Sequence, residues 1–274
     1  MEYFKLNNGI LMPAVGSGTW QMNGESGEYA ILTAVEKGYR LFDTAQMYGN
    51  EDILGKALKK SGLERKNFFL TTKLFTPSTG YKKALLGIEE SLERLQTDYI
   101  DLMLIHGPYK EAEEMYEAMK YSYSKGKLKA IGLSNFNSQQ FSEFVKVCGI
   151  IPQVLQSEIH VYYFRECTIS AAQKCGTQMQ AWSPLTSGRS GISNDELLSE
   201  IGKKYNKTAA QIALKYLIQN NIAVIPKSKA PSRVSDNIDL FDFELETDDM
   251  MKIRKLDKKH RISVYMKINR RVLM

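Results

Sequence analysis

The sequence predicts an α/β fold, a (β/α)8 TIM barrel with an N-terminal β-hairpin that closes the bottom of the barrel. Short apolar, β-branched runs alternate with amphipathic stretches along the chain, and eight such units can be distinguished. Strands that alternate with helices pair in parallel, and the helices then cover the sheet. The length of 274 residues is close to the roughly 250 residues typical of such a barrel.

The hairpin is the first predicted element. Asn7-Asn8-Gly9 separates Phe4-Lys5-Leu6 from Ile10-Leu11-Met12. Because Asn-Gly favours a tight turn with positive φ, we expect the two flanking segments to pair as antiparallel strands. The hairpin precedes the first barrel strand, so we expect it to lie across the bottom of the barrel.

The strands are expected where apolar and β-branched residues cluster. The predicted strands are Ala14–Trp20, Tyr39–Ala45, Phe68–Leu74, Ile100–His106, Lys129–Asn135, Val154–His160, Thr177–Pro184 and Ala223–Ser228. The helices are expected where apolar residues recur at helical spacing, as do Ala84, Ile88, Leu92 and Leu95. The predicted helices are Tyr29–Lys37, Glu51–Lys60, Lys82–Leu95, Ala112–Lys125, Gln139–Val147, Arg165–Lys174 and Ala209–Asn220.

A doubly wound sheet is the competing architecture. It usually has a glycine-rich turn after the first strand and an acidic residue at the end of the second. Gly16-Ser17-Gly18-Thr19-Trp20 begins like that turn but lacks the third glycine, and Trp20 fits poorly beside a pyrophosphate. No linker rich in Pro, Gly or Ser divides the chain. We therefore expect one barrel domain over residues 1–274, with a short irregular C-terminal tail from about residue 262.

Composition narrows the possible partners and the location. The formal net charge of +6 and the pI near 9.0 suggest an anionic partner such as a phosphorylated small molecule. The sequence lacks the pattern of aromatic residues interleaved with basic ones that is typical of nucleic-acid binding. No apolar run approaches the roughly 18–20 residues that cross a membrane. Three cysteines form no C-x-x-C pair, and no secretory signal is visible, so a reducing, cytoplasmic setting is expected. We expect a monomer, with a weak dimer as the alternative.

Polar residues at successive strand ends form a candidate catalytic set. Chemistry on this fold takes place at the carboxyl ends of the strands. Asp43, Lys73 and His106 end the second, third and fourth predicted strands, and Tyr48 lies just beyond Asp43. Singly, each has a structural explanation: Asp43 and Lys73 as an ion pair, Tyr48 as a loop aromatic, His106 as a buried core histidine. Together these explanations would require four coincidences at one end of one barrel.

These four residues share a chemistry, which is proton-coupled hydride transfer. A phenol has an unperturbed pKa of about 10, and an adjacent ammonium such as Lys73 lowers it, so Tyr48 becomes a better proton donor. Asp43 would hold the Lys73 charge in place. His106 would donate a hydrogen bond to a carbonyl oxygen, forming with Tyr48 a small oxyanion hole. A cofactor must supply the hydride, because no side chain can do so.

The chain resembles the aldo-keto reductase superfamily from Leu6 to about Arg261. The resemblance rests on several motifs in order. They are Leu6-Asn7-Asn8-Gly9, Gly18-Thr19-Trp20, Asp43-Thr44-Ala45 with Tyr48-Gly49-Asn50-Glu51, Lys73, His106, Gly132-Leu133-Ser134-Asn135-Phe136 and Ile225-Pro226-Lys227-Ser228. The resemblance implies an NADPH-dependent enzyme that reduces aldehydes or ketones to alcohols, with Tyr48 as general acid.

The resemblance also implies a set of cofactor-binding residues. Ser134, Asn135 and Gln156 would hydrogen-bond the nicotinamide carboxamide, and Trp182 would stack on its ring. The 2′-phosphate would meet Lys227, Ser228 and Arg233, and cationic side chains favour a phosphate over a hydroxyl. The remaining implied cofactor contacts are Gly18, Thr19, Asp43, Ser183, Leu185, Asp236 and Asn237. No metal is implied.

The implied substrate pocket consists of Trp20, Tyr48, His106 and Gly107. Relatives usually carry Trp or Phe where this chain has Gly107, so we expect an open pocket unless another side chain fills that space. An NADPH-binding regulatory or redox-sensing subunit on the same fold is the alternative function. A metal-dependent hydrolase is a third hypothesis, which the three scattered histidines argue against.

Overall fold

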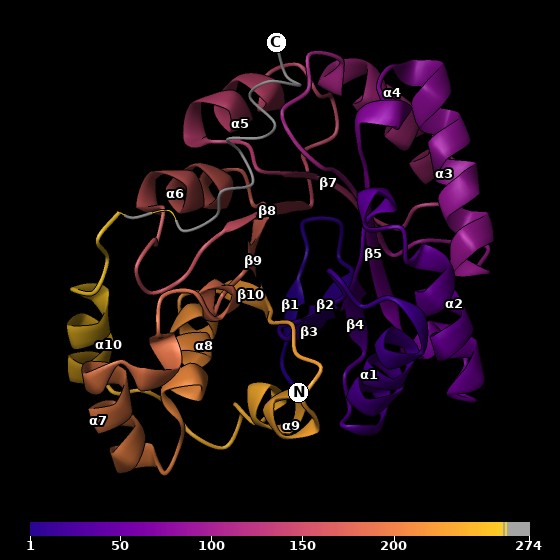
Figure 1. Ribbon diagram of the computed structural model, residues 1–274. Helices are drawn as coiled ribbons and strands as arrows, with labels where there is room; N and C mark the ends of the chain where they lie inside the picture. Colours follow the sequence, from indigo (N-terminus) through magenta and orange to yellow (C-terminus); the bar gives the residue numbers. More distant parts are fainter. Residues whose placement is uncertain (260, 262–274) are drawn as a thin grey trace.

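Eight parallel strands form a barrel surrounded by helices in the computed structural model, which describes residues 1–259 and 261 (Figure 1). The strands are β3 (Gly16–Gly18), β4 (Leu41–Asp43), β5 (Phe69–Leu74), β6 (Leu102–Ile105), β7 (Ile131–Ser134), β8 (Val154–Glu158), β9 (Gln178–Trp182) and β10 (Ile222–Ile225). The (β/α)8 prediction is confirmed. The tail predicted from residue 262 lies outside the described residues.

The barrel closes between its first and last strands. Neighbours in sequence pair in parallel from β3 to β10. A parallel bridge joins Val15 to Val224, and Val224 N donates to Ala14 O at 2.9 Å. Gly18 N donates to Pro226 O at 3.1 Å on the same seam. Closure brings the ends of β3 and β10 together, although about 200 residues separate them in the sequence.

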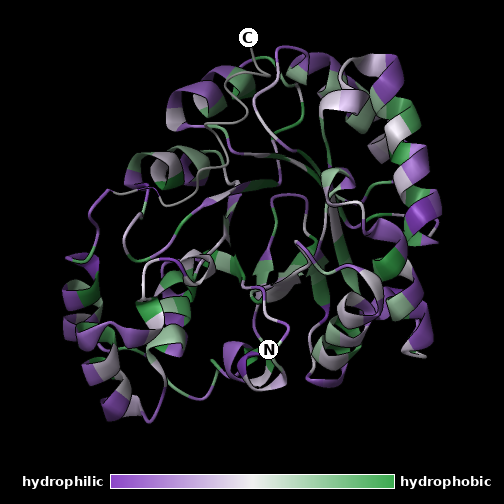
Figure 2. Ribbon diagram, viewed as in Figure 1, coloured by the Kyte–Doolittle hydropathy of each residue, from purple (hydrophilic) through white to green (hydrophobic). Residues whose placement is uncertain are grey.

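The helices cover the outside of the barrel. They are α1 (Gly24–Glu36), α2 (Glu51–Lys60), α3 (Tyr81–Leu95), α4 (Ala112–Ser124), α5 (Ser138–Val145), α6 (Glu166–Lys174), α7 (Glu196–Tyr205), α8 (Ala209–Gln219), α9 (Pro231–Ile238) and α10 (Thr247–Arg254). Short 3₁₀ turns are η1 (Gln46–Tyr48), η2 (Arg65–Asn67), η3 (Thr76–Ser78), η4 (Thr186–Gly188) and η5 (Ile192–Asn194). The hydropathy colouring shows apolar positions on the helix sides that face the strands (Figure 2). None of the described helices is both long and apolar enough to cross a membrane.

The predicted helices are confirmed in place, and two begin with a full capping box. Thr208 Oγ1 accepts from Gln211 N, and the Gln211 side chain accepts from Thr208 N, at the start of α8. Asn137 and Gln140 do the same for α5. Each box satisfies two backbone N–H groups that a helix start leaves unpaired. The prediction for α1 was wrong in its start, because the helix begins at Gly24, five residues before Tyr29.

Most of the predicted strands were too long at both ends. Trp20, His106 and Asn135 each lie after their strand, in the loop that follows. The sequence pattern did not reveal these strand ends, because Trp20 is apolar, and His106 and Asn135 are buried, like the strand residues before them. Trp20 is the exception to burial, with 43% of its surface exposed.

The predicted hairpin is confirmed as β1 (Tyr3–Lys5) and β2 (Leu11–Pro13), paired antiparallel. Its turn reaches the amino ends of two barrel strands. Asn7 Nδ2 donates to Pro152 O at 3.2 Å, and Asn8 Nδ2 donates to Lys129 O at 3.0 Å. Buried Leu6 and Met12 pack against apolar side chains of the barrel interior. The hairpin therefore closes the end of the barrel opposite the predicted site.

Candidate active site

The structure brings the four predicted catalytic residues together at the carboxyl end of the barrel. Asp43 is the last residue of β4, and Lys73 is the next-to-last residue of β5. His106 follows β6 directly, and Tyr48 ends η1. Parallel strands place their carboxyl ends on one rim, which is why residues so far apart in sequence meet there.

Asp43 and Lys73 form a buried ion pair. Lys73 Nζ donates to Asp43 Oδ1 at 2.5 Å and to Thr44 O at 2.7 Å. Both side chains are buried, and burial raises the pKa of Asp43 and lowers the pKa of Lys73, while their mutual attraction opposes both shifts. Two acceptors on one ammonium and a carboxylate in contact with it favour the charged form of both groups.

Tyr48 lies between Lys73 and His106. Lys73 Nζ is 5.2 Å from the centre of the Tyr48 ring. The ring centres of Tyr48 and His106 are 5.8 Å apart, with the rings inclined at 74°. Burial, with a smaller contribution from the Lys73 charge, lowers the pKa of His106 to about 3. His106 is therefore neutral at physiological pH and keeps one ring N–H as a donor.

The turn that carries Tyr48 is tied to α3 through Gln46. Gln46 Nε2 donates to Gly87 O at 2.7 Å and to Ser91 Oγ at 3.0 Å. A Cβ at Gly87 would lie 2.4 Å from Ser78 Oγ, so only glycine lets α3 approach this closely. The turn thus starts from a fixed point two residues before Tyr48.

Residues predicted to hold the nicotinamide form a connected set of hydrogen bonds. Ser134, Gln156 and Gln180 lie in register on β7, β8 and β9. Asn135 Nδ2 donates to His106 O at 2.9 Å and to Ser134 Oγ at 3.0 Å. Trp182 Nε1 donates to Asn135 Oδ1 at 2.9 Å. These contacts fix the planes of the Asn135 amide and the Trp182 indole beside the candidate catalytic residues.

Gly18 and Thr19 are built into the seam of the barrel. A Cβ at Gly18 would lie 3.1 Å from Ile225 O, tighter than an ordinary contact. Thr19 is buried, and both its N and its Oγ1 donate to Asp43 O, at 2.9 and 3.0 Å. The two hydrogen bonds from Thr19 hold the carboxyl end of β4, the strand that ends in Asp43.

Ser183 and Leu185 lie in the loop after β9. Ser183 has a φ of +51°, and its Oγ is 2.7 Å from Ser187 Oγ. Leu185 is half-buried and packs against the core. Glycines and serines with positive φ recur through the loop, at Ser187, Gly188 and Gly191. Such backbone presents successive N–H groups toward one side, an arrangement that suits an anion.

The predicted phosphate-binding residues lie between β10 and the end of α9. Lys227 and Arg233 are exposed, and Ser228 Oγ accepts from Ala230 N at 3.1 Å. Partial burial and the charge of Lys229 lower the pKa of Lys227. Among residues 1–259 and 261, no carboxylate forms an ion pair with Lys227 or Arg233. Two uncompensated cations, one just after β10 and one in the first turn of α9, suit a dianionic phosphate.

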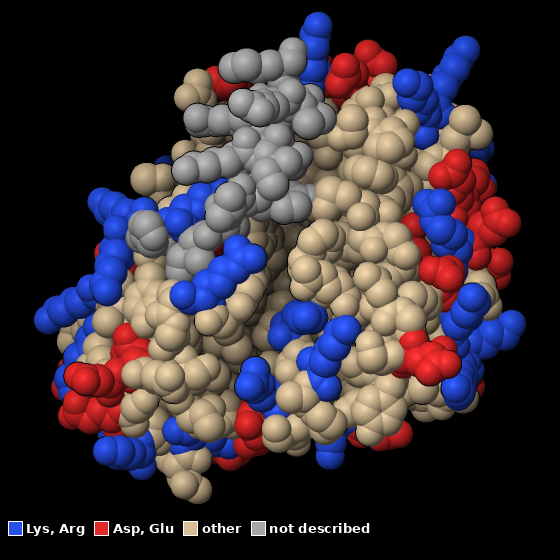
Figure 3. All heavy atoms as spheres, viewed as in Figure 1, with Lys and Arg blue, Asp and Glu red and all other residues tan. Residues whose placement is uncertain are grey.

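The predicted adenine-contacting pair differs in exposure. Asp236 is exposed, whereas Asn237 is buried with 5% of its surface accessible. The space-filling view shows a hollow near the centre of the face seen there, with Lys and Arg side chains along its lower edge (Figure 3). The described residues contain no group of three His, Cys, Asp or Glu placed to hold a metal ion.

The space beside Gly107 is partly filled by a residue that the sequence did not single out. A Cβ at Gly107 would meet Tyr109 Cζ at 3.9 Å, an ordinary contact. Tyr109 is partly buried, and burial raises the pKa of its hydroxyl. The sequence signal that could have indicated this filling is an aromatic residue, Tyr109, two positions after Gly107. The pocket is therefore less open on this side than Gly107 alone suggested.

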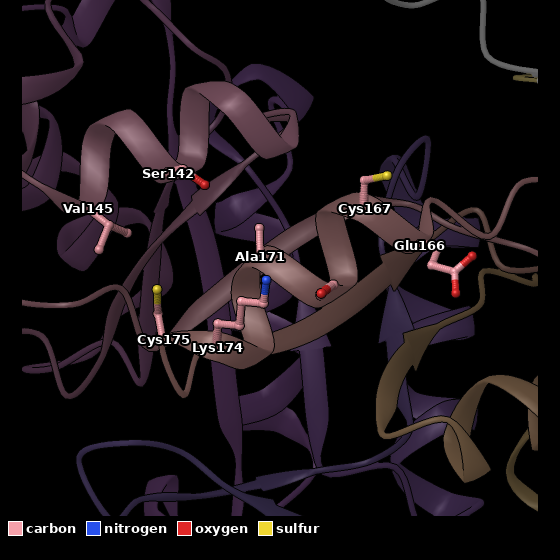
Figure 4. Close-up of a pocket in the computed structure, with 8 residues that line it drawn as sticks. Ser142, Val145, Glu166, Cys167, Ala171, Lys174 and Cys175 are labelled. Atoms are coloured by element: carbon pink, nitrogen blue, oxygen red, sulfur yellow. The ribbon is translucent and has the colours of Figure 1, made fainter.

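An open cavity of about 480 Å³ lies elsewhere, between α5 and α6 (Figure 4). Its walls include Val145, Cys167, Ala171 and Lys174. No predicted catalytic or cofactor-binding residue lines it. The candidate active site is thus defined by the strand ends and not by this cavity.

Comparison with known proteins agrees with this geometry. The model of the Aldo/keto reductase family matches residues 12–258. The glyoxal reductase of Bacillus subtilis (strain 168) is 39% identical over 260 residues, which cover 94% of this chain and 94% of that protein. The methylglyoxal reductase DkgA of Escherichia coli (strain K12) is 36% identical over 261 residues, again covering 94% of each chain.

Two solved structures extend the comparison. The aldo-keto reductase MGS-M4, from a Medee basin deep-sea metagenome library, superposes with a TM-score of 0.93 at 40% identity, covering 95% of this chain and 97% of that one. An aldo-keto reductase of Bombyx mori in complex with NADP superposes with a TM-score of 0.91 at 31% identity, covering 97% and 96%.

Proposed function

Because this chain belongs to the aldo/keto reductase family, an oxidoreductase family that acts on carbonyl compounds, we propose that it reduces aldehydes or ketones to alcohols with NADPH, and that Tyr48 is the general acid. One observation carries the proposal. Tyr48 lies beside the ammonium of a buried ion pair on one side, with Lys73 Nζ 5.2 Å from its ring centre, and beside neutral His106 on the other.

Each residue then has one task in proton transfer. Tyr48 passes its hydroxyl proton to the carbonyl oxygen as negative charge develops there. The Lys73 ammonium stabilises the phenolate that remains, and Asp43 with Thr44 O holds that ammonium in place. His106, neutral because of burial, donates its ring N–H to the same carbonyl oxygen and orients it.

NADPH, when bound, supplies the hydride. Lys227, Ser228 and Arg233 would hold its 2′-phosphate, where the described residues leave the cations uncompensated. Ser134, Asn135 and Gln156 would hold the carboxamide, and Trp182 would stack on the ring. Ser183 and Leu185 would follow the pyrophosphate, with Asp236 and Asn237 at the adenine. The Bombyx mori relative, solved with NADP, supports the choice of cofactor.

We further propose that the substrates are small aldehydes, including glyoxal and methylglyoxal. Two relatives named for these compounds share 39% and 36% of their residues with this chain over nearly its whole length. Trp20, Tyr48 and His106 offer aromatic walls, and Tyr109 narrows the space beside Gly107. Such walls suit a small carbonyl compound better than a large ketone.

A substrate panel tests the proposed function. Purified protein is mixed with NADPH or NADH and with glyoxal, methylglyoxal, an aldose or a steroid ketone, and the absorbance of the reduced nicotinamide is followed. We expect turnover with NADPH and the two small aldehydes first. Tight NADPH binding without turnover of any carbonyl would contradict the proposal and favour a regulatory or sensing subunit.

A further inference from the structure

Trp20, the exposed wall of the proposed pocket, sits on a tight turn. Met22 N donates to Thr19 O at 2.9 Å, which closes a four-residue β-turn over Thr19–Met22. Gln21, at the third position, has a φ of +61°. That region is unfavourable for a residue with a side chain, so contacts from outside the turn must offset the strain.

Buried Asn50 supplies such contacts. Its side-chain Nδ2 donates to Thr19 O at 2.8 Å and to Met22 O at 3.1 Å, which are the carbonyls at the two ends of the turn. Its Oδ1 accepts from Thr44 Oγ1 at 2.8 Å, beside Asp43. The residue has no exposed surface, and its amide is satisfied at both ends.

Asn50 also belongs to the loop that carries Tyr48, two residues further along the chain. The ring centres of Trp20 and Tyr48 are 4.7 Å apart, with the rings inclined at 66° in an edge contact. Gln46, at the start of the Tyr48 turn, makes its hydrogen bonds to α3. The distance between the two rings therefore depends on the side chain that joins their loops.

We propose that Asn50 is a positioning residue that holds the Trp20 wall against Tyr48 and so sets the fit of small substrates. This inference rests on the proposed function for its kinetic consequence. Its structural part, the attachment of the Trp20 turn to the Tyr48 loop, stands without any turnover. Asn50 acts through Trp20, so loss of its amide affects substrate binding more than the chemical step.

The first test reads Trp20 directly. The chain has two tryptophans, Trp20 and Trp182, so Trp182→Phe leaves Trp20 as the sole indole. Time-resolved fluorescence anisotropy of the free protein then reports the local motion of Trp20. Adding Asn50→Asp, which keeps the size but cannot make both donor contacts at once, should increase the amplitude of the fast decay about twofold, as expected when a ring loses its fixed contact.

Gln153→Ala is the matched control. Gln153 is another buried amide with three hydrogen bonds, to Asn7 Oδ1, Ile151 O and Ile131 N, but at the amino end of the barrel. It should lower stability and leave the Trp20 anisotropy unchanged. If both variants change the anisotropy alike, or Asn50→Asp does not change it, Asn50 does not position Trp20. Should Asn50→Asp fail to fold, Asn50→Ala removes both Nδ2 donors to the turn without placing a carboxyl group in the buried site, and the same two outcomes apply.

The second test is a double-mutant cycle in the wild-type background with methylglyoxal. Asn50→Asp should raise KM roughly three- to tenfold, the value of one aromatic edge contact, and change kcat by less than about threefold. With Trp20→Ala already present, the further change in KM should be under about twofold. An equal rise in KM with and without Trp20 would overturn the proposal. Absence of turnover in the wild type would instead contradict the proposed function, while the anisotropy still decides the role of Asn50.

Discussion

Gln156 Nε2 donates a 2.7 Å hydrogen bond to Asp43 Oδ2, on the carboxylate oxygen that Lys73 leaves free. An ionised carboxylate only accepts, so this contact fixes which way the Gln156 amide faces. The second hydrogen on Nε2 goes to Gln180 Oε1 at 2.8 Å. Both donors are in use, and Gln156 Oε1 is the atom left to accept from a carboxamide. One side chain thus links the proposed cofactor contact to the proposed catalytic pair.

Gln156→Met should therefore impair catalysis through Asp43. The variant keeps the side-chain length but removes the hydrogen bond that stabilises the Asp43 carboxylate, so the pKa of Asp43 rises and its hold on the Lys73 charge weakens. We expect kcat to fall about tenfold, the value of one charge-assisted hydrogen bond. Steady-state kinetics measures this. Gln180→Met is the control, because Gln180 contacts Gln156 but makes no hydrogen bond to Asp43; an equal loss in both variants would contradict the role of the Asp43 contact.

Lys73→Met should destabilise the protein as well as inactivate it. The substitution leaves the Asp43 carboxylate buried without its cation, which typically costs about 3–5 kcal/mol of unfolding free energy. Urea unfolding followed by circular dichroism gives this value. The double variant Lys73→Met/Asp43→Leu should recover much of the loss while staying inactive. A single variant as stable as wild type would show that the buried pair is not charged in the folded protein.

His106 should make the protein sensitive to acid. Its pKa in the folded protein is about 3, below the ordinary 6.5, so between these values the unfolded chain binds a proton that the folded protein does not. The contribution of neutral His106 to the unfolding free energy is fully present above pH 6.5. As the pH is lowered from 6.5 to the folded pKa, this contribution decreases by about 1.4 kcal/mol per pH unit. From pH 7 to pH 5, wild type should lose about 2 kcal/mol more than His106→Gln. Urea unfolding at both pH values checks this, and an equal loss in the two proteins would contradict a neutral His106.

Lys227→Ala should weaken the binding of NADPH much more than the binding of NADH. The variant removes one charge-assisted contact to the 2′-phosphate, which corresponds to roughly a ten- to hundredfold rise in the NADPH dissociation constant. Quenching of protein fluorescence on titration with each cofactor measures both constants. Lys56→Ala, which removes an exposed lysine paired with Asp52 on α2, is the control. Equal weakening of NADPH and NADH would show that Lys227 does not contact the 2′-phosphate.

The sequence predicted most of the barrel and the meeting of the four candidate catalytic residues at one end of it, because both follow from local patterns. Asp43, Lys73 and His106 stand at strand ends, and a parallel barrel brings such ends together whatever the details of packing. Helices α7, α9 and α10 were not among the predicted helices, because few of their residues are buried and their apolar pattern is correspondingly weak. In α9, for example, only Val234 and Asn237 are buried.

Contacts made across loops were harder to predict. Asn50 stands in the motif that carried the resemblance, yet its role depends on two carbonyls some thirty residues earlier in the chain. Tyr109 fills space beside Gly107 only because the loop folds back on itself, with Tyr109 N donating to Gly107 O at 2.8 Å. Neither contact has a spacing or periodicity that a single sequence displays.

The proposed reaction depends on Tyr48 as the proton donor to the carbonyl oxygen. The most direct measurement compares wild type with Tyr48→Phe, using NADPH and methylglyoxal and following the absorbance of the reduced nicotinamide. We expect kcat/KM to fall about 10²- to 10⁴-fold, the usual contribution of a general acid, while the dissociation constant of NADPH stays within about twofold of wild type. A Tyr48→Phe variant that retains activity within a few-fold of wild type would contradict the assignment.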